Sequence, residues 1–140
     1  YILIEHPVNQ KECISFMERF VGTLGFKSVK IMSPQAHDEI ISFTSQLPHA
    51  IAVSLINSDN EKYETGKYIG DSYRDLTRIA NINENLWSEL FLRNSDYLLA
   101  SIEAFEEQLD LIKVALKDND ERLLKDLFIK SSLRREKLEK

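Results

Sequence analysis

Residues 33–52 constrain the fold more than any other stretch, because they form an apolar helical pattern that is interrupted by polar residues and a proline. The stretch begins with Ser33 followed by proline, which is the favoured order of N-cap and first helical residue. Further along, Pro48 has no N–H to donate to the carbonyl of Thr44. We therefore expect one helix over residues 34–57 that is kinked near Pro48.

Three polar side chains of this helix fall near a common line. At ~100° per residue, spacings of seven and four place Asp38, Ser45 and His49 on one stripe. Two interpretations are open at this point. The stripe faces a ligand, or its side chains are polar groups satisfied by hydrogen bonds inside a helical bundle.

The length and composition are those of a single domain with enough apolar residues to form a hydrophobic core. Its 140 residues are 43% hydrophobic and carry a net charge of −5, which argues against nucleic acid as the main partner. No apolar run approaches the ~20 residues of a membrane span, and no signal-peptide pattern is present. The single cysteine, Cys13, excludes an intrachain disulfide and fits a reducing compartment, so we expect a cytoplasmic location with Cys13 as a small core residue.

The first 32 residues have the pattern of a strand, a helix and a second strand. Residues 1–4 are apolar and β-branched, a helical pattern follows from Asn9 to the C-cap candidate Gly25, and residues 26–31 alternate with period two. This order predicts a parallel βαβ unit. Because two strands do not make a stable sheet, and because the chain opens with Tyr1 in the middle of a strand pattern, we expect further strands upstream.

Residues 33–140 are expected to be all-helical, which makes the predicted fold mainly α. Besides the first helix, we expect helices over residues 72–81, 84–94, 96–117 and 119–137. The polar residues 58–70 form a surface loop or lid. The helix over 96–117 carries a heptad-like apolar seam made of Leu98, Ile102, Phe105, Leu109, Ile112 and Leu116. Such a seam packs against the last helix of the same chain or against another subunit.

A second polar group precedes the only tryptophan, Trp87. Four charged residues share one face of a short helix, namely Asp71, Arg74, Asp75 and Arg78. One interpretation is a set of exposed ion pairs worth under ~1 kcal/mol each. The other is a site for a small aromatic carboxylate, with an arginine holding the carboxylate through paired hydrogen bonds beside an apolar body.

Two motifs together carry a family resemblance. The run H-D-E-I-I-S-F-T-S-Q-L-P-H-A-I-A at 37–52, with R-D-L-T-R-I-A at 74–80 and L-W at 86–87, resembles the prephenate dehydrogenase family. The resemblance spans essentially the whole chain. It implies that residues 1–32 are the last βαβ piece of a Rossmann-type nucleotide-binding domain, and that residues 33–140 are a helical dimerisation and substrate-binding domain.

Members of that family use NAD or NADP to convert prephenate to 4-hydroxyphenylpyruvate, a step of tyrosine biosynthesis. The resemblance therefore implies a homodimer that binds prephenate and tyrosine-like small molecules. From composition we expect no nucleic acid or membrane partner, and from the few histidines we expect no metal. The family's glycine-rich phosphate loop and its catalytic histidine have no counterpart here. We expect no catalytic residue in this stretch, and we expect the isolated fragment to be inactive.

Site roles follow from the resemblance, position by position. Arg78 matches the arginine that binds a substrate carboxylate. His49 matches a histidine that lines the substrate pocket, and Ser45 matches a serine beside it. Trp87 resembles the aromatic wall at the edge of the pocket.

The remaining matched residues are expected to support the site. Asp75 resembles an aspartate in an ionic network that gates access to the arginine, and Arg74 stands where the family carries Arg or Lys. A structural role is expected for His37, Asp38 and Pro48.

The sequence departs from the family pattern after residue 80. Residues 82–85 replace a serine and a proline that often precede the tryptophan, although Asn83 can still cap the next helix. An arogenate or dual-specificity cyclohexadienyl dehydrogenase shares the same motifs and is an alternative. A non-catalytic helical dimerisation module is another. A metal phosphohydrolase, suggested by His37 beside Asp38, would need more ligands than His6 and His49 can add.

Overall fold

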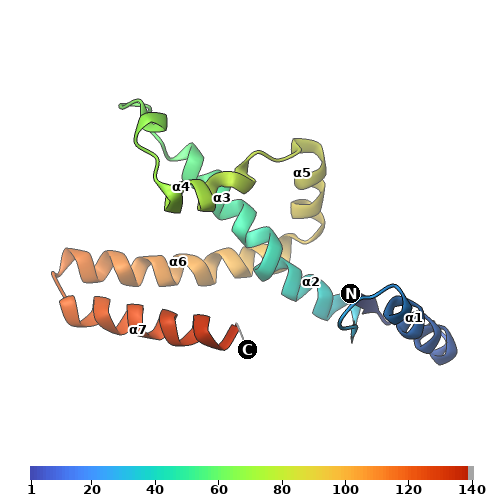
Figure 1. The fold of residues 1–140 in the computed structure, drawn as a ribbon. Helices are drawn as coiled ribbons and strands as arrows, with labels where there is room; N and C mark the ends of the chain where they lie inside the picture. Colours follow the sequence, from blue (N-terminus) through green and yellow to red (C-terminus); the bar gives the residue numbers. More distant parts are fainter. Residues whose placement is uncertain (139–140) are drawn as a thin grey trace. The chain divides into compact units, whose positions relative to one another are not determined.

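The structure, a computed structural model, describes residues 1–138. Two short strands stand at the N-terminus, and helices make up most of the rest (Figure 1). The prediction of a mainly α chain with a small βαβ piece is confirmed. The chain divides into two compact units, and the division lies between Leu99 and Ala100. The division predicted between residues 32 and 33 stays a prediction.

The N-terminal βαβ unit consists of β1 (Ile2–Ile4), α1 (Lys11–Thr23) and β2 (Lys30–Met32). The two strands pair in parallel, with Leu3 opposite the central residue of β2. Leu3 is buried beneath the helix, and Val21 supplies the buried apolar contact from α1. The predicted strand–helix–strand order is therefore confirmed.

The second strand is shorter than the alternation over residues 26–31 predicts. It begins only at Lys30, because β1 has three residues and each pairs with one residue of β2, from Lys30 to Met32. Phe26 instead sets its ring edge-on to that of Tyr1, with the centroids 5.2 Å apart. Gly25 has φ +88°, a conformation that suits glycine, so its predicted place after the end of α1 is confirmed.

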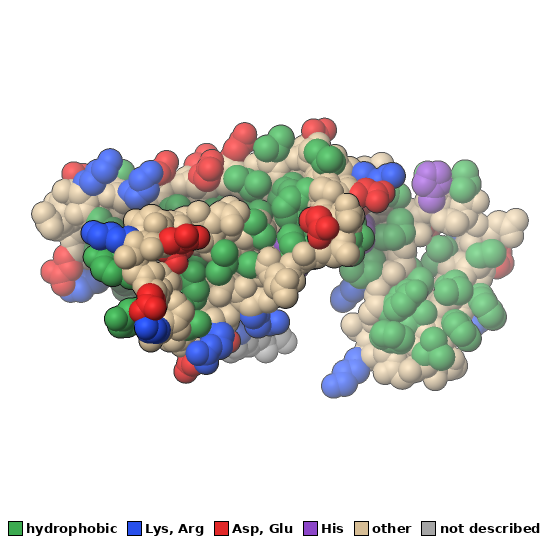
Figure 2. All heavy atoms as spheres, turned by 90° about the horizontal axis from the view of Figure 1, so that it is seen from above, with side chains coloured by type: hydrophobic (Ala, Val, Ile, Leu, Met, Phe, Trp, Pro, Cys, Tyr) green, Lys and Arg blue, Asp and Glu red, His purple; other side chains and the backbone are tan. Residues whose placement is uncertain are grey.

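Hydrophobic side chains gather on the surface of the βαβ unit, at the right of Figure 2. Phe16 and Phe20 stack with their centroids 6.2 Å apart, and both are exposed, as is Leu24. Cys13 is also exposed, so its prediction as a core residue is wrong. The helical pattern correctly predicts that Cys13 lies in a helix, but it does not show which face of that helix is buried.

The helix predicted over residues 34–57 is three consecutive segments. They are α2 (Pro34–Ile41), a π-helical turn (Ser42–Gln46) and α3 (Leu47–Asn57). Ser33 accepts a hydrogen bond from the backbone N–H of Ala36 at 3.1 Å, which confirms it as the N-cap. The chain runs on from α2 into α3 without a sharp turn (Figure 1).

Residues 58–70 form a connection that contains one 3-10 turn, Thr65–Lys67. Glu61 adopts φ 55° there. Hydrogen bonds from the side chain of Thr65 and from the backbone of Glu61 lower the pKa of the Asp59 carboxyl group. This segment is the surface loop that the sequence predicts.

The short helix predicted over residues 72–81 is α4 (Asp71–Thr77), which tightens into a 3-10 turn at Arg78–Ala80. Both pieces pack against α3. After them, α5 (Glu84–Arg93) begins at Asn83, whose side chain accepts the N–H of Leu86 at 2.9 Å.

The last two helices are α6 (Ser95–Lys117) and α7 (Glu121–Leu138). α7 runs back along α6 after a tight turn (Figure 1). Of the predicted seam on α6, Leu98 is only 4% exposed, whereas Leu109 and Leu116 are 46% and 60% exposed. The chain thus covers part of the seam and leaves part open.

Candidate functional site

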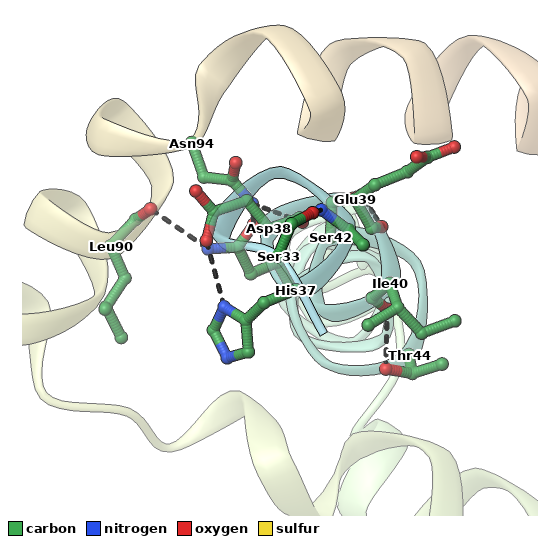
Figure 3. A network of polar contacts seen from close by, with 11 residues as sticks. Ser33, His37, Asp38, Glu39, Ile40, Ser42, Thr44, Leu90 and Asn94 are labelled. Carbon is green, nitrogen blue, oxygen red and sulfur yellow. Dashed lines mark hydrogen bonds and ion pairs between the residues drawn. The ribbon is translucent and has the colours of Figure 1, made fainter. Parts of the chain in front are cut away.

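The π-helical turn Ser42–Gln46 organises the candidate site. It is closed by the backbone N–H of Leu47 donating to the carbonyl of Ser42, five residues back. Side chains take up carbonyls along this wide turn. Ser42 Oγ donates to the carbonyl of Glu39 and Thr44 Oγ1 donates to that of Ile40, both at 2.7 Å (Figure 3). A π-turn is uncommon and occurs often at functional sites.

Pro48 is the second residue after this turn and lies in the first turn of α3. We expect a kink there, but the backbone irregularity is the π-turn that ends two residues earlier. Its position explains why the chain tolerates it, since the first turn of a helix does not need the N–H that proline lacks.

His49 is held by its own helix. Its Nδ1 lies 2.8 Å from the backbone carbonyl oxygen of Ser45. Because a carbonyl oxygen only accepts, Nδ1 carries the proton, and Nε2 of the neutral ring is then an acceptor. The predicted pair of His49 and Ser45 is thus in contact, through the backbone of Ser45. Both residues are half-buried.

The imidazole of His49 stacks on the indole of Trp87. Their centroids are 3.7 Å apart with the planes 29° from parallel, and Phe91 meets the indole edge-on at 5.7 Å. Residues far apart in the sequence therefore form one aromatic wall between α3 and α5. The sequence motifs named His49 and Trp87 separately, and the structure brings them together.

An amide pair that was not predicted from the sequence, the buried Gln46 and the half-buried Asn94, ties the π-turn to α5. Gln46 donates through Nε2 to the carbonyl of Leu90 at 3.0 Å and accepts at Oε1 from Asn94 at 2.8 Å. Asn94 also donates to the carbonyl of Asp38 at 2.9 Å. Figure 3 shows Asn94, between α5 and α6, with its side chain towards the π-turn. No local sequence pattern distinguishes Gln46 or Asn94 from an exposed amide, so this contact becomes visible only in the structure.

Asp38 contacts a neighbouring side chain of its own helix. Its carboxylate lies 2.9 Å from Nδ1 of its neighbour His37 (Figure 3). A π-turn lies between Asp38 and His49, and the common stripe of Asp38, Ser45 and His49 stays a prediction. The structural role expected of His37 and Asp38 stays a prediction.

Arg78 is exposed and opens the 3-10 turn that packs against α3. Within residues 1–138 it forms no ion pair, and neither does Asp75, whereas Arg74 and Asp71 pair across 3.7 Å. The four charged residues were expected on one helical face. Arg78 is the C-cap of α4, and its backbone N–H still donates to the carbonyl of Arg74, four residues back.

The turn after β1 does not suit the pyrophosphate of a dinucleotide. It contains Pro7 and no glycine, and the N–H of His6 is already bonded to Asn9 Oδ1 at 2.7 Å. Over residues 1–138, no group of three or more potential ligands is placed to hold a metal ion. No helix in this same range is long and apolar enough to cross a membrane.

Comparison with known proteins places the chain in a family. Residues 33–130 match the family described as "Prephenate dehydrogenase, dimerization domain". The chain is 27% identical to the cyclohexadienyl dehydrogenase of Zymomonas mobilis over 139 residues, which covers 91% of this chain and 47% of that protein. It is also 27% identical to the prephenate dehydrogenase of Bacillus subtilis, with coverage of 86% and 33%. The chain thus spans less than half the length of these relatives.

Solved structures share the fold. The prephenate dehydrogenase of Aquifex aeolicus, in complex with hydroxyphenyl propionate and NAD+, superposes with a TM-score of 0.82 at 30% identity, covering 96% of this chain and 49% of that one. The arogenate dehydrogenase of Synechocystis superposes with a TM-score of 0.87 at 20% identity, covering 98% and 51%. With the matched segment covering most of its residues, the chain belongs to the prephenate dehydrogenase dimerization-domain family.

Proposed function

We propose that this chain is the dimerisation and substrate-side part of an NAD(P)-dependent dehydrogenase, which oxidatively decarboxylates prephenate to 4-hydroxyphenylpyruvate in tyrosine biosynthesis. The observation that carries the proposal is the stack of His49 on Trp87. The 3-10 turn that begins with Arg78 packs against α3, the helix that carries His49. An aromatic wall between α3 and α5, together with an exposed guanidinium on a turn that packs against α3, suits a ring that bears a carboxylate.

Each side chain has a proposed role in binding. Arg78 holds a substrate carboxylate through paired hydrogen bonds, and its lack of an ion pair within residues 1–138 leaves its donors open for this. Trp87 and His49 form the wall against the ring, with Ser45 beside them. Asp75 and Arg74 govern access to Arg78.

The cofactor is proposed to bind outside these residues, because the turn after β1 does not fit it. NAD is favoured as the cofactor type by the Aquifex complex, which contains NAD+. The hydride-accepting group and the catalytic histidine would then come from the rest of the protein. The single cysteine supports a reducing, cytoplasmic location.

The kinetic test uses Arg78→Ala in the full-length protein. Losing charge-assisted hydrogen bonds worth at least about 2 kcal/mol should raise the KM for prephenate about 30-fold or more, with the KM of the cofactor unchanged. Arg93→Ala is the matched control, because Arg93 is also exposed and is paired with Glu89 on α5 at 2.7 Å. An unchanged KM for prephenate in Arg78→Ala would contradict the proposal.

A second candidate differs only in the substrate. The Zymomonas relative is named a cyclohexadienyl dehydrogenase, which favours an enzyme that accepts arogenate as well as prephenate. Steady-state kcat/KM values for the two substrates, measured on the same preparation, decide between them. Turnover of neither substrate by the full-length protein would favour a non-catalytic dimerisation module instead.

Dimerisation is proposed to use the α6–α7 hairpin. Large apolar side chains are exposed on both helices, namely Leu109, Val114, Leu116, Phe128, Ile129 and Leu133. Their number supports an apolar interface with a second copy, where the part of the seam left open would be covered. Sedimentation of the chain tests this, and a monomer at high micromolar concentration would count against it.

A further inference from the structure

Gln46, the last residue of the π-turn, is a long polar side chain that is only 4% exposed. Both ends of its amide are hydrogen-bonded, with Nε2 to the carbonyl of Leu90 and Oε1 to Asn94. A buried amide that is satisfied at both ends has one orientation, because its donor and acceptor cannot be exchanged without breaking both bonds.

Asn94 completes the arrangement from the other side. It is the single residue between α5 and α6. Its Nδ2 carries two hydrogens, and these go to Gln46 Oε1 at 2.8 Å and to the carbonyl of Asp38 at 2.9 Å. Asn94 thus joins the end of α2, the π-turn and the end of α5 (Figure 3). We refer to Gln46 and Asn94 as the amide clamp.

The amide clamp lies one helical turn from the aromatic stack. Gln46 precedes His49 by three residues, and Leu90 follows Trp87 by three. The contact of Gln46 with Leu90 and the contact of His49 with Trp87 are therefore neighbouring links between the same two stretches of chain, which run antiparallel there.

The two links differ in how strictly they fix position. Stacked rings tolerate sliding, since offset arrangements of an aromatic pair are close in energy. Hydrogen bonds are directional and weaken steeply as the donor angle closes. The clamp therefore has the geometry needed to fix the register of α5 against the π-turn, and the rings follow from that register.

We propose that Gln46 and Asn94 are positioning residues that set the His49–Trp87 stack and so shape the substrate wall. Neither needs to touch the substrate, because Gln46 is buried and Asn94 points into the helix junction. The kinetic consequence rests on the proposed function, whereas the effect on the stack does not. A misplaced wall should weaken substrate binding more than it slows the chemical step.

The experiment compares Asn94→Ala and Gln46→Met with wild type in the full-length protein. A protonated imidazole quenches the fluorescence of an indole that it contacts. The stack is therefore measured as the loss of tryptophan fluorescence in acid that is present with His49 and absent in His49→Asn. Both clamp variants should lose most of this quenching. Their KM for prephenate should rise roughly 10- to 100-fold, with kcat and the KM of the cofactor close to wild type.

Thr44→Val is the matched control. Thr44 lies in the same π-turn, and its hydroxyl donates to the carbonyl of Ile40 without reaching α5. It should keep both the quenching and the KM. Circular dichroism checks folding, and if Gln46→Met fails to fold, Asn94→Ala decides.

Two results would overturn the proposal: wild-type quenching in Asn94→Ala, or the same losses in Thr44→Val. If wild type does not turn over prephenate at all, the proposed function fails, and the quenching measurement still tests the clamp.

Discussion

Capping side chains fix where the helices around the site begin. Ser33 accepts the N–H of Ala36 at 3.1 Å and Asn83 accepts that of Leu86 at 2.9 Å. The second cap matters more for the site, because Trp87 lies in the first turns of the helix that it starts. Each cap satisfies a backbone donor that the helix itself leaves without a partner.

Replacing Asn83 by alanine should lower the free energy of unfolding by about 1 kcal/mol, since the N–H of Leu86 loses its acceptor. Urea denaturation followed by circular dichroism measures the change. Asn85→Ala is the control, because Asn85 is exposed in the same helix and makes only a long side-chain contact to Glu84 at 3.4 Å. A loss in Asn83→Ala no larger than in Asn85→Ala would show that the cap is not stabilising.

The caps could be predicted from the sequence, and the amide clamp could not. Each cap and its partner are three residues apart, so a local pattern contains both. Gln46 and Asn94 are 48 residues apart, and nothing local distinguishes them from exposed amides. In the same way, the motifs named His49 and Trp87, but only the fold brings their rings into contact.

At the scale of elements, the sequence predicts where the first long helix begins and ends but not how it is built inside. Its apolar pattern fits an α-helix throughout, and one π-helical turn adds too little offset to be visible in that pattern. Pro48 was the sign of an irregularity. The break lies before it, at Ser42–Gln46, where side-chain donors can satisfy the displaced carbonyls.

Pro48→Ala tests this arrangement. A proline in the interior of a helix costs about 3 kcal/mol relative to alanine. If Pro48 were such an interior residue, its replacement by alanine would stabilise the protein by about that amount. Because Pro48 lies in the first turn of α3 behind the π-turn, we expect a change below about 1 kcal/mol. Ser54→Pro, at an exposed position inside the same helix, should destabilise by about 3 kcal/mol. Thermal unfolding monitored at several scan rates compares the two.

At the scale of the molecule, the helices could be predicted and their uncovered faces could not be assigned. The heptad-like seam indicates that α6 needs a partner, and α7 runs back along α6 (Figure 1). Sequence periodicity does not say whether the remaining apolar surface meets the same chain or a second copy. Leu109 and Leu116 are the residues that this question concerns.

Phe128→Glu tests the proposed dimer. Phe128 is 58% exposed on α7, and a charge there should weaken association by at least about 2 kcal/mol, or roughly 30-fold in the dissociation constant. Sedimentation velocity over a concentration series measures the shift towards monomer. Lys137→Glu introduces a glutamate on the opposite side of α7, at ~100° per residue, and should leave association unchanged. Equal dissociation constants for the two variants would place the interface elsewhere.

The π-turn also makes the number of residues between Asp38 and Gln46 as important as their chemistry. Gaining or losing one residue there would rotate His49 by ~100° about its helix and carry the buried amide of Gln46 away from Leu90. The connection over residues 58–70 carries no such penalty, since lengthening a surface loop costs little. Among related sequences, insertions and deletions should therefore occur in that connection. The segment from Asp38 to Gln46 should keep its number of residues even where the residues themselves are substituted.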